Sequence, residues 1–278
     1  MSGQNAEDTA EYIIRASSLS GWNDCPRRNF ANAYKHLVKN AGYDLRERGK
    51  LVSGAFGTSV HAAAAHAMRQ KLSNLRVDED DLNDVCVAKF DEEIADGVSW
   101  DQSSKNRENA IKQMKACIAS YVYDVLPSIK DVESFERLDL AMVKTDKNLS
   151  GHADLVTKTS IRDIKTGRSG DGCHGQMGGY ALLQLANTDK LPDELIVDHI
   201  PRSAVTKPYP GAVAIKYDVR VCVAEAATMI DIISRTIDEF VKKPGPILIP
   251  ANTMSILCGE KYCTAFGTDY CELSKKVS

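Results

Sequence analysis

The chain has 278 residues, enough for one large domain or two modest ones around a packed core. Hydrophobic residues make up 43% and charged residues 26%, the ordinary composition of a globular protein. The 35 Lys and Arg residues against 38 Asp and Glu give a net charge of −3, which excludes a strongly basic chain. A nucleic-acid binder is not excluded, because a local basic groove is enough to bind phosphates.

The N-terminal segment and the hydropathy pattern predict a cytoplasmic protein. Residues 1–18 lack the basic start and apolar run of a signal peptide, and no stretch approaches the roughly 18 apolar residues of a membrane span. We therefore expect no membrane partner. Stable disulfides are disfavoured in the cytoplasm, so some of the eight cysteines are candidate metal ligands.

The first half of the chain is predicted to be helical after a polar lead at residues 1–16. Residues 18–40 read as a loop followed by an amphipathic helix, with Phe30, Tyr34 and Leu37 among its apolar positions. Residues 54–72 form a second, alanine-rich helix. Two more helices are expected near 80–97 and 105–126, the latter ending before Pro127.

The second half alternates between strands and helices. The periodicity predicts strands and helices in this order: a strand in 132–143, strands near 151–157 and 160–165 joined by the turn TKTS, a helix at 176–186, strands in 194–201 and 213–222, and a helix at 224–241. An irregular tail with three cysteines follows. This order predicts an α/β fold with a helical insertion at about residues 66–126.

Two carboxylates and a lysine lie close together on the predicted hairpin. Asp163 and Lys165 are two apart on a strand and share one face, and the antiparallel turn can bring Asp154 beside Asp163. Converging carboxylates repel each other unless a cation lies between them, and Mg²⁺ prefers such oxygen ligands. A lysine beside the ion could stabilise charge on a phosphate, so the set favours metal-assisted phosphodiester hydrolysis. The alternative is an exposed hairpin with a surface Asp–Lys pair.

Five short motifs in order resemble the RecB-like exonuclease branch of the PD-(D/E)XK nuclease superfamily. They are Cys25-Pro-Arg-Arg, Gly57-Thr58-x-x-His61, Gly151-x-x-Asp154, Asp163-Ile164-Lys165-Thr166-Gly167 and Gln176-x-x-x-Tyr180. The resemblance extends from about residue 17 to residue 271. It implies a restriction-endonuclease-like core, with a mixed central sheet flanked by helices. Phage recombination nucleases and the CRISPR-associated RecB-like exonuclease are similar stand-alone members.

The resemblance also implies roles for individual residues. His61, Asp154, Asp163 and the backbone carbonyl of Ile164 would bind Mg²⁺ or Mn²⁺, and Lys165 would be the catalytic lysine. Gln176 and Tyr180 lie one helical turn apart, on a face that borders the DNA and the active site in this family. From the sequence alone, His61 would equally fit a buried core histidine. His66, His152, Glu133 and Glu136 have weaker claims to a role at the metal.

Four cysteines are candidates for a second metal site. Cys25 precedes the core, and Cys258, Cys263 and Cys271 lie in the tail. Spacing alone allows zinc, an iron–sulfur cluster or unrelated reduced thiols. The resemblance implies a four-iron four-sulfur cluster that joins the chain ends, with zinc as the alternative, although Cys258-x4-Cys263 is longer than the family's usual spacing. Cys86, Cys117 and Cys222 are expected to be core residues; Cys173 has no assigned role.

Basic residues near the N-terminus are candidate DNA contacts. Arg27, Arg28 and Lys35 could guide the strand together with Tyr180, although such a charge run would equally suit a solvated face. A separate motif, GDGCHG at Gly170–Gly175, has the G-x-G-x-x-G spacing of a dinucleotide-binding loop. We interpret it as a flexible loop beside an active site, because the preceding strand is too polar for a buried parallel strand.

These patterns lead to one principal prediction. We expect a polar lead at 1–16, a nuclease domain at 17–245 and a cysteine-rich tail at 246–278 that closes on Cys25. The expected activity is metal-dependent DNA exonuclease, acting in recombination, repair or processing in a bacterial or infected-host cytosol, alone or with a recombinase, annealing protein or helicase. A non-catalytic DNA-binding or assembly factor is the second hypothesis, and a nicotinamide-dependent oxidoreductase using Gly170–Gly175 is the third.

Overall fold

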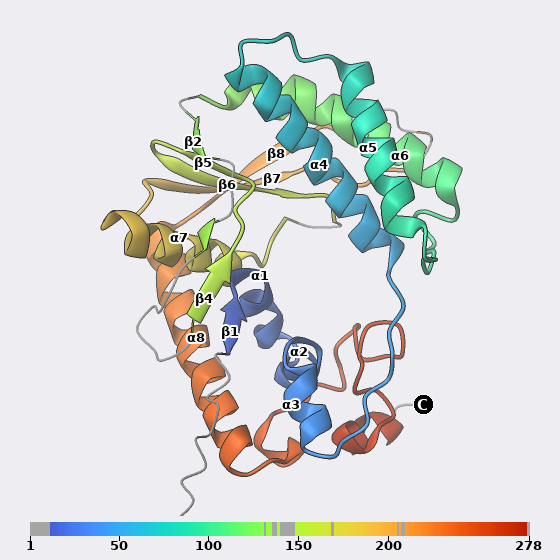
Figure 1. Cartoon of the computed structure of the whole chain (residues 1–278), viewed down its shortest axis with the longest axis vertical. Helices are drawn as coiled ribbons and strands as arrows, with labels where there is room; N and C mark the ends of the chain where they lie inside the picture. The colour runs from blue at the N-terminus through green and yellow to red at the C-terminus, as the bar shows by residue number, and fades with distance from the viewer. Residues whose placement is uncertain are drawn as a thin grey trace, which may run out of the picture.

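The computed structural model describes residues 12–130, 132–134, 138–139, 148–167, 170–204, 206 and 209–276. Its centre is a five-stranded sheet in the order β2-β5-β6-β7-β8 (Figure 1). The strands are β2 (Val132–Ser134), β5 (Leu155–Thr157), β6 (Ser160–Lys165), β7 (Glu194–His199) and β8 (Val213–Tyr217). The β6–β7 pair is parallel and the other pairs are antiparallel, so the sheet is mixed, as the sequence predicts.

Helices cover both faces of this sheet. On one face lie α7 (His174–Thr188), which connects β6 to β7, and α8 (Val219–Lys242). On the other lie α4 (Val52–Leu72), α5 (Glu79–Ile94) and α6 (Arg107–Ser120) (Figure 1). Successive β6 residues point to opposite faces, so Ile161 belongs to the core with α7 and α8, whereas Ile164 belongs to the core with α4 and α6. The α/β fold class is therefore confirmed.

A smaller sheet extends the structure on the α7 side. It has the order β1-β4-β3, with β1 (Ile13–Arg15), β4 (Asn148–Gly151) and β3 (Leu138–Asp139). Residues 13–15, assigned above to the polar lead, pair in parallel with β4, and Ile14 is fully buried. Three residues are too few to show a strand periodicity, and their partner lies more than 130 residues along the chain. Residues 1–11 and the predicted strand residues Phe135 and Leu140 lie outside the described ranges.

The N-terminal region and the C-terminal tail lie side by side (Figure 1). The N-terminal elements are α1 (Ala16–Leu19), η1 (Ser20–Asn23), α2 (Pro26–Ala33) and α3 (Lys35–Asn40). The tail contains η4 (Pro246–Leu248) and η5 (Asp269–Lys276). The amphipathic helix predicted before residue 40 is thus two helices, because the chain leaves helical geometry at Tyr34, with φ −117 and ψ 42. Its apolar positions still face the core, with Phe30 fully buried.

The predicted helix over 105–126 changes its hydrogen-bonding pattern before it ends. α6 continues as a π-helical turn, η2 (Tyr121–Val125), and a 3₁₀ turn, η3 (Leu126–Ser128). Of the helices in the described part of the chain, none combines the length and apolar character required to span a membrane.

Candidate active site

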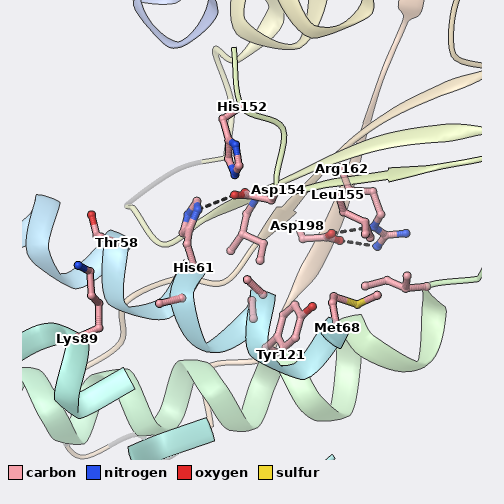
Figure 2. Close-up of a pocket in the computed structure, with 15 residues that line it drawn as sticks. Thr58, His61, Met68, Lys89, Tyr121, His152, Asp154, Leu155, Arg162 and Asp198 are labelled. Carbon is pink, nitrogen blue, oxygen red and sulfur yellow. Dashed lines mark hydrogen bonds and ion pairs between the residues drawn. The ribbon is translucent and has the colours of Figure 1, made fainter. Parts of the chain in front are cut away.

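Asp154 links the end of the hairpin to the long helix α4. It lies just before β5, where its Oδ2 accepts a hydrogen bond from the backbone N–H of Ile164 at 2.7 Å. Its other oxygen, Oδ1, is 2.7 Å from Nδ1 of His61 on α4 (Figure 2). The antiparallel register pairs Leu155 with Arg162, so Asp154 lies opposite the Asp163–Ile164 segment. The structure therefore brings His61 to the hairpin from nearly a hundred residues upstream.

Asp163 is the centre of a second group on the α7 side of β6. It is 2% exposed, and its Oδ2 lies 2.6 Å from Nζ of Lys165. Its Oδ1 accepts from Nε2 of Gln176 at 3.3 Å and from the hydroxyl of Tyr180 at 3.4 Å, and Gln176 Nε2 also donates to the Tyr180 hydroxyl at 2.7 Å. The one-turn spacing of Gln176 and Tyr180 on α7 thus directs both side chains at the same carboxylate.

The glycine of the Gly151-x-x-Asp154 motif is required by packing. A Cβ at Gly151 would lie 2.9 Å from a ring carbon of Tyr180 and 2.8 Å from Leu183. Such distances are shorter than real contacts, so a larger residue would force the side chains of Tyr180 and Leu183 to move. Gly151 therefore helps to hold Tyr180 near Asp163.

The charges of His61 and Asp154 stabilise each other. Burial alone would lower the pKa of His61, but the charge and hydrogen bond of Asp154 outweigh it, so the pKa of His61 is raised. Burial likewise opposes ionisation of Asp154, but His61 and the Ile164 N–H lower the pKa of this carboxyl below its usual value. Asp154 is therefore a permanent anion at neutral pH.

The pKa of Asp163 shifts in the opposite direction to that of Asp154. Burial, and then repulsion from Asp154, raise the pKa of Asp163 to about 6 despite the nearby Lys165. Burial lowers the pKa of Lys165, but the Asp163 carboxylate outweighs it and the pKa is raised, which keeps the lysine charged. Asp154 and Asp163 are held close together although this raises the pKa of Asp163. Such a pair of carboxylates is typical of a site that binds a cation between them.

The donor atoms fit a hard divalent cation. The buried Oδ2 of Asp163 faces the ammonium of Lys165 at 2.6 Å, and no other hydrogen-bond donor among the described residues reaches it. A metal ion at this oxygen would share it with Lys165, in line with the preference of Mg²⁺ for carboxylates. Within the described ranges, however, no three His, Cys, Asp or Glu side chains are already arranged to enclose a metal ion. The Ile164 carbonyl stays a prediction, and the side chains of Glu133 and Glu136 lie outside the description.

The four candidate cluster cysteines line one small cavity. Cys25, Cys258, Cys263 and Cys271 meet there with Arg28 and Asn252, and the backbone N–H of Asn252 donates to the Cys25 sulfur at 3.4 Å. All eight cysteines are free thiols. Burial, followed by the neighbouring cysteines, raises the pKa of Cys258 and raises that of Cys263 to about 11. The raised pKa values of Cys258 and Cys263 disfavour the thiolate forms of these two residues when no cation is bound.

Like Tyr180, the other predicted DNA-contacting residues have partners within the protein. Arg27 and Arg28 are 8% and 6% exposed. Arg27 donates to the carbonyls of Pro246 and Ile249, and Arg28 pairs with Asp24 at 2.7 Å. Lys35 forms an exposed ion pair with Glu47 at 2.8 Å. Contact with DNA stays a prediction for these residues, and the burial of both arginines favours a structural role.

Packing explains two of the three glycines of the GDGCHG loop. A Cβ at Gly170 would lie 2.9 Å from His199 and 2.6 Å from Ile215, and a Cβ at Gly175 would lie 3.2 Å from Leu19 and from the Ser20 backbone. The third, Gly172, has a φ of +77. The preceding strand β6 is buried and pairs in parallel with β7, so the expectation that it is too polar for a buried parallel strand is wrong. The spacing of the loop needs no bound dinucleotide as an explanation.

Several side chains near the site have no clear signal in the sequence. Arg162 and Asp198 form a buried pair with two hydrogen bonds, Nε to Oδ2 at 2.8 Å and Nη2 to Oδ1 at 2.6 Å (Figure 2). They line a cavity beside His61 and Asp154, together with Tyr121 and His152. In the sequence, Arg162 and Asp198 are polar residues within predicted strands, with nothing to show that they are partners. The register between β6 and β7 brings them together. His66, by contrast, bonds Asp81 at 2.8 Å.

The class of the protein follows from its match to a protein family. Over residues 15–230 the sequence matches the PD-(D/E)XK nuclease superfamily. The chain belongs to this superfamily and is therefore a nuclease, which replaces the oxidoreductase hypothesis. Nucleases of this superfamily generally use Mg²⁺ or Mn²⁺.

Solved structures give a similar result for the fold. The crystal structure of a candidate exonuclease from Eubacterium rectale matches with a TM-score of 0.55 at 10% identity, covering 93% of this chain and 92% of that one. The structure of the protein SSO0001 matches with a TM-score of 0.30 at 14% identity over 82% and 79% of the two chains, too weakly to support an argument. No curated protein matches the sequence. At these identities the likeness concerns the fold alone.

Proposed function

We propose that the protein is a metal-dependent DNA exonuclease. The observation that supports this most directly is the meeting of His61, Asp154, Asp163 and Lys165 at one end of β5 and β6. Asp154, Asp163 and His61 offer the oxygen and nitrogen ligands that Mg²⁺ or Mn²⁺ would need. A bound ion would supply Lewis-acid polarisation of the scissile phosphate.

The side chains have separable roles in this proposal. Lys165 carries a fixed positive charge that can stabilise the phosphate oxygens and orient the attacking water. Gln176 and Tyr180 hold Asp163 in place through its Oδ1, so that Oδ2 faces Lys165 and could be shared with the ion. His61 holds Asp154 from α4, while the Ile164 N–H holds its second oxygen. Because these supports come from three elements, the carboxylates are fixed before DNA arrives.

An iron–sulfur cluster is proposed for the four cysteines. Their common cavity between α2 and the tail supports this, and so does their sulfur chemistry, which suits iron–sulfur clusters and zinc. Anaerobic purification should yield a brown protein with about four iron atoms per chain, and Cys258→Ala should lose both the colour and the iron. A colourless protein containing one zinc atom would instead assign the cavity to zinc.

The nuclease proposal is tested with end-labelled single- and double-stranded DNA in Mn²⁺. Lys165→Ala should lower the rate of degradation at least about 100-fold, since one charge-stabilising group is worth about that much. Asp163→Ala should have a similar effect. Lys216→Ala is the matched control, because Lys216 lies on β8 in an exposed pair with Glu194. Circular dichroism checks that each variant is folded.

The outcomes also separate the remaining alternatives. Successive loss of single nucleotides from a labelled end would support an exonuclease, whereas fragments of intermediate length would indicate internal cleavage. DNA binding without any metal-dependent cleavage would favour the non-catalytic assembly factor. Full activity of Lys165→Ala would contradict the assignment of the site. We place the enzyme in DNA recombination, repair or processing, where a recombinase, annealing protein or helicase would supply or consume the ends.

A further inference from the structure

A cavity of about 230 Å³ lies on the other side of β6 from Asp163 and Lys165. It is enclosed by α4, the π-helical turn η2 and the strands β5 to β7 (Figure 2). His61 and Asp154 line it directly, so it is continuous with the proposed catalytic centre. This volume has room for several water molecules or for one heterocyclic ring system.

Small side chains on α4 create this space. The run at residues 61–68 contains five alanines, of which Ala62, Ala64 and Ala65 line the cavity. In a packed helix-on-sheet layer these positions would be occupied by Leu or Ile, which would fill the volume. An unfilled apolar space lowers stability, so its presence next to catalytic residues favours a ligand site over a packing defect.

The turn η2 places an aromatic ring against the same space. Tyr121 is the first residue of the π-helical turn, and it is 2% exposed. Figure 2 shows its ring directed from the helix towards the strands. π-helical turns are rare and frequently mark functional sites. With Met68, Leu155 and Ile164, the ring gives the cavity the flat and polarisable apolar walls that suit an aromatic ligand.

The charges around the cavity argue against an anion as its occupant. Its guanidinium, Arg162, is neutralised by the paired hydrogen bonds to Asp198. The second cation of the lining, Lys89, pairs with Glu92 at 2.9 Å and with Glu93 at 3.2 Å, and His61 pairs with Asp154. A phosphate group would therefore find no net positive charge on these walls, whereas a neutral heterocycle would gain apolar contacts there.

We propose that this cavity receives the terminal nucleobase of the DNA strand that the enzyme degrades. The inference rests on the proposed nuclease function and assigns a substrate site to it. A phosphate held at Asp154 and Asp163 would leave the adjoining nucleoside next to the cavity, because His61 and Asp154 belong to both. A pocket for one base accepts a strand end readily, which gives a physical basis for attack at ends.

The first test uses the unaltered protein and substrates that lack one base. Stacking on protein side chains is worth about 1–3 kcal/mol per base, or about 5- to 150-fold in affinity. A strand that ends in an abasic nucleotide should therefore show a KM raised about 5- to 150-fold. A strand with the abasic nucleotide five positions inward should release its first nucleotide with the KM of the intact strand. Both strand ends are examined separately, since only one of them is the end attacked.

The second test fills the cavity. Ala65→Phe occupies the space from α4, and Ala88→Phe on the exposed face of α5 is the matched control. Oligonucleotides with 2-aminopurine at the end or five positions inward are bound to the Lys165→Ala protein, in which the DNA stays intact. The terminal probe should change its fluorescence more than the internal probe. Ala65→Phe should abolish that difference, whereas Ala88→Phe should preserve it.

The outcomes separate this inference from the nuclease proposal. Equal KM values for terminal and internal abasic strands, or equal fluorescence of the two probes, would overturn the base pocket while metal-dependent degradation continued. Absence of degradation by the unaltered protein would instead overturn the nuclease function. Loss of folding in Ala65→Phe leaves the abasic substrates decisive, because they need no variant.

Discussion

At the residue scale, neighbouring groups have opposing effects on the pKa of Asp163. Burial and Asp154 raise its pKa to about 6, while Lys165 favours the ionised form. In the unfolded chain an aspartate titrates near 4. The folded metal-free protein therefore binds the proton of Asp163 more tightly than the unfolded chain does, which ties stability to pH.

This linkage gives a signed prediction. The free energy of unfolding of the metal-free protein, relative to Asp163→Asn, should fall as pH rises from about 4 through about 6, by on the order of 1–3 kcal/mol. Stability from the raised pKa is present at low pH and lost as the carboxyl ionises. Urea unfolding in EDTA at several pH values measures it. A difference that stays constant with pH would contradict the raised pKa.

Addition of Mn²⁺ should restore the stability that the metal-free protein loses as pH rises. In the proposed site Mn²⁺ would bind the ionised carboxylate, so at pH 8 it should raise the melting temperature of the unaltered protein more than that of Asp163→Asn. Differential scanning fluorimetry across a series of Mn²⁺ concentrations checks this without any catalytic readout. Equal shifts for the two proteins would place the ion elsewhere.

At the element scale, the contact between α7 and α8 holds Gln176 and Tyr180 against the sheet. Gly178 and Gly179 allow the close approach, since a Cβ at Gly178 would lie 1.9 Å from the backbone oxygen of Cys222 on α8. A Cβ at Gly179 would lie 2.9 Å from that of Ala16 on α1. Gly178 and Gly179 lower the helix propensity of this segment. They are also the residues that allow α7 to pack closely against α8 and α1.

Gly178→Ala should lower the free energy of unfolding by at least about 2 kcal/mol, because the clash is with backbone and cannot be relieved by a side-chain rotation. Gly54→Ala on α4 is the control. Its Cβ would meet nothing within 4 Å, and alanine should stabilise the helix by about 0.5–1 kcal/mol. Chemical denaturation measures both. A neutral Gly178→Ala would mean that α7 and α8 are farther apart than described.

At the scale of the whole molecule, hydrogen bonds join helix α2 to the C-terminal tail beside the nuclease core. Arg27 donates from Nε to Ile249 at 2.9 Å and from an Nη to Pro246 at 2.6 Å, and its own N–H bonds the Pro250 carbonyl. Asp24, Arg28 and Ser255 form a neighbouring network. These contacts hold the tail where Cys258, Cys263 and Cys271 share a cavity with Cys25.

Arg27→Met should therefore destabilise the protein by about 2–4 kcal/mol, because a buried and a half-buried carbonyl lose a charged donor. Lys35→Ala should change stability by less than about 1 kcal/mol, since its ion pair is exposed. Denaturation gives these values, and DNA affinity is measured on the folded proteins. A large loss of affinity with unchanged stability in Arg27→Met would restore its predicted role as a DNA contact.

Much of the site could be predicted from local patterns. The alternation around Asp163 and Lys165 and the one-turn spacing of Gln176 and Tyr180 depend only on strand and helix geometry. The strands β5 to β8 and the helices α4 to α8 follow from periodicity in the same way. The strand β1 was missed because three residues leave no periodic signal, and the burial of Arg27 was missed because its partners lie in the tail.

The sequence by itself determined the class of this protein: a carboxylate–lysine hairpin between helices, with motifs in the order typical of PD-(D/E)XK nucleases. Only the tertiary structure decided which groups meet. It joined His61 to Asp154, paired Arg162 with Asp198 and left a cavity between the α4 alanines and Tyr121. The physical reason is that residue spacing sets which way a side chain points, whereas strand register and helix packing set what it touches.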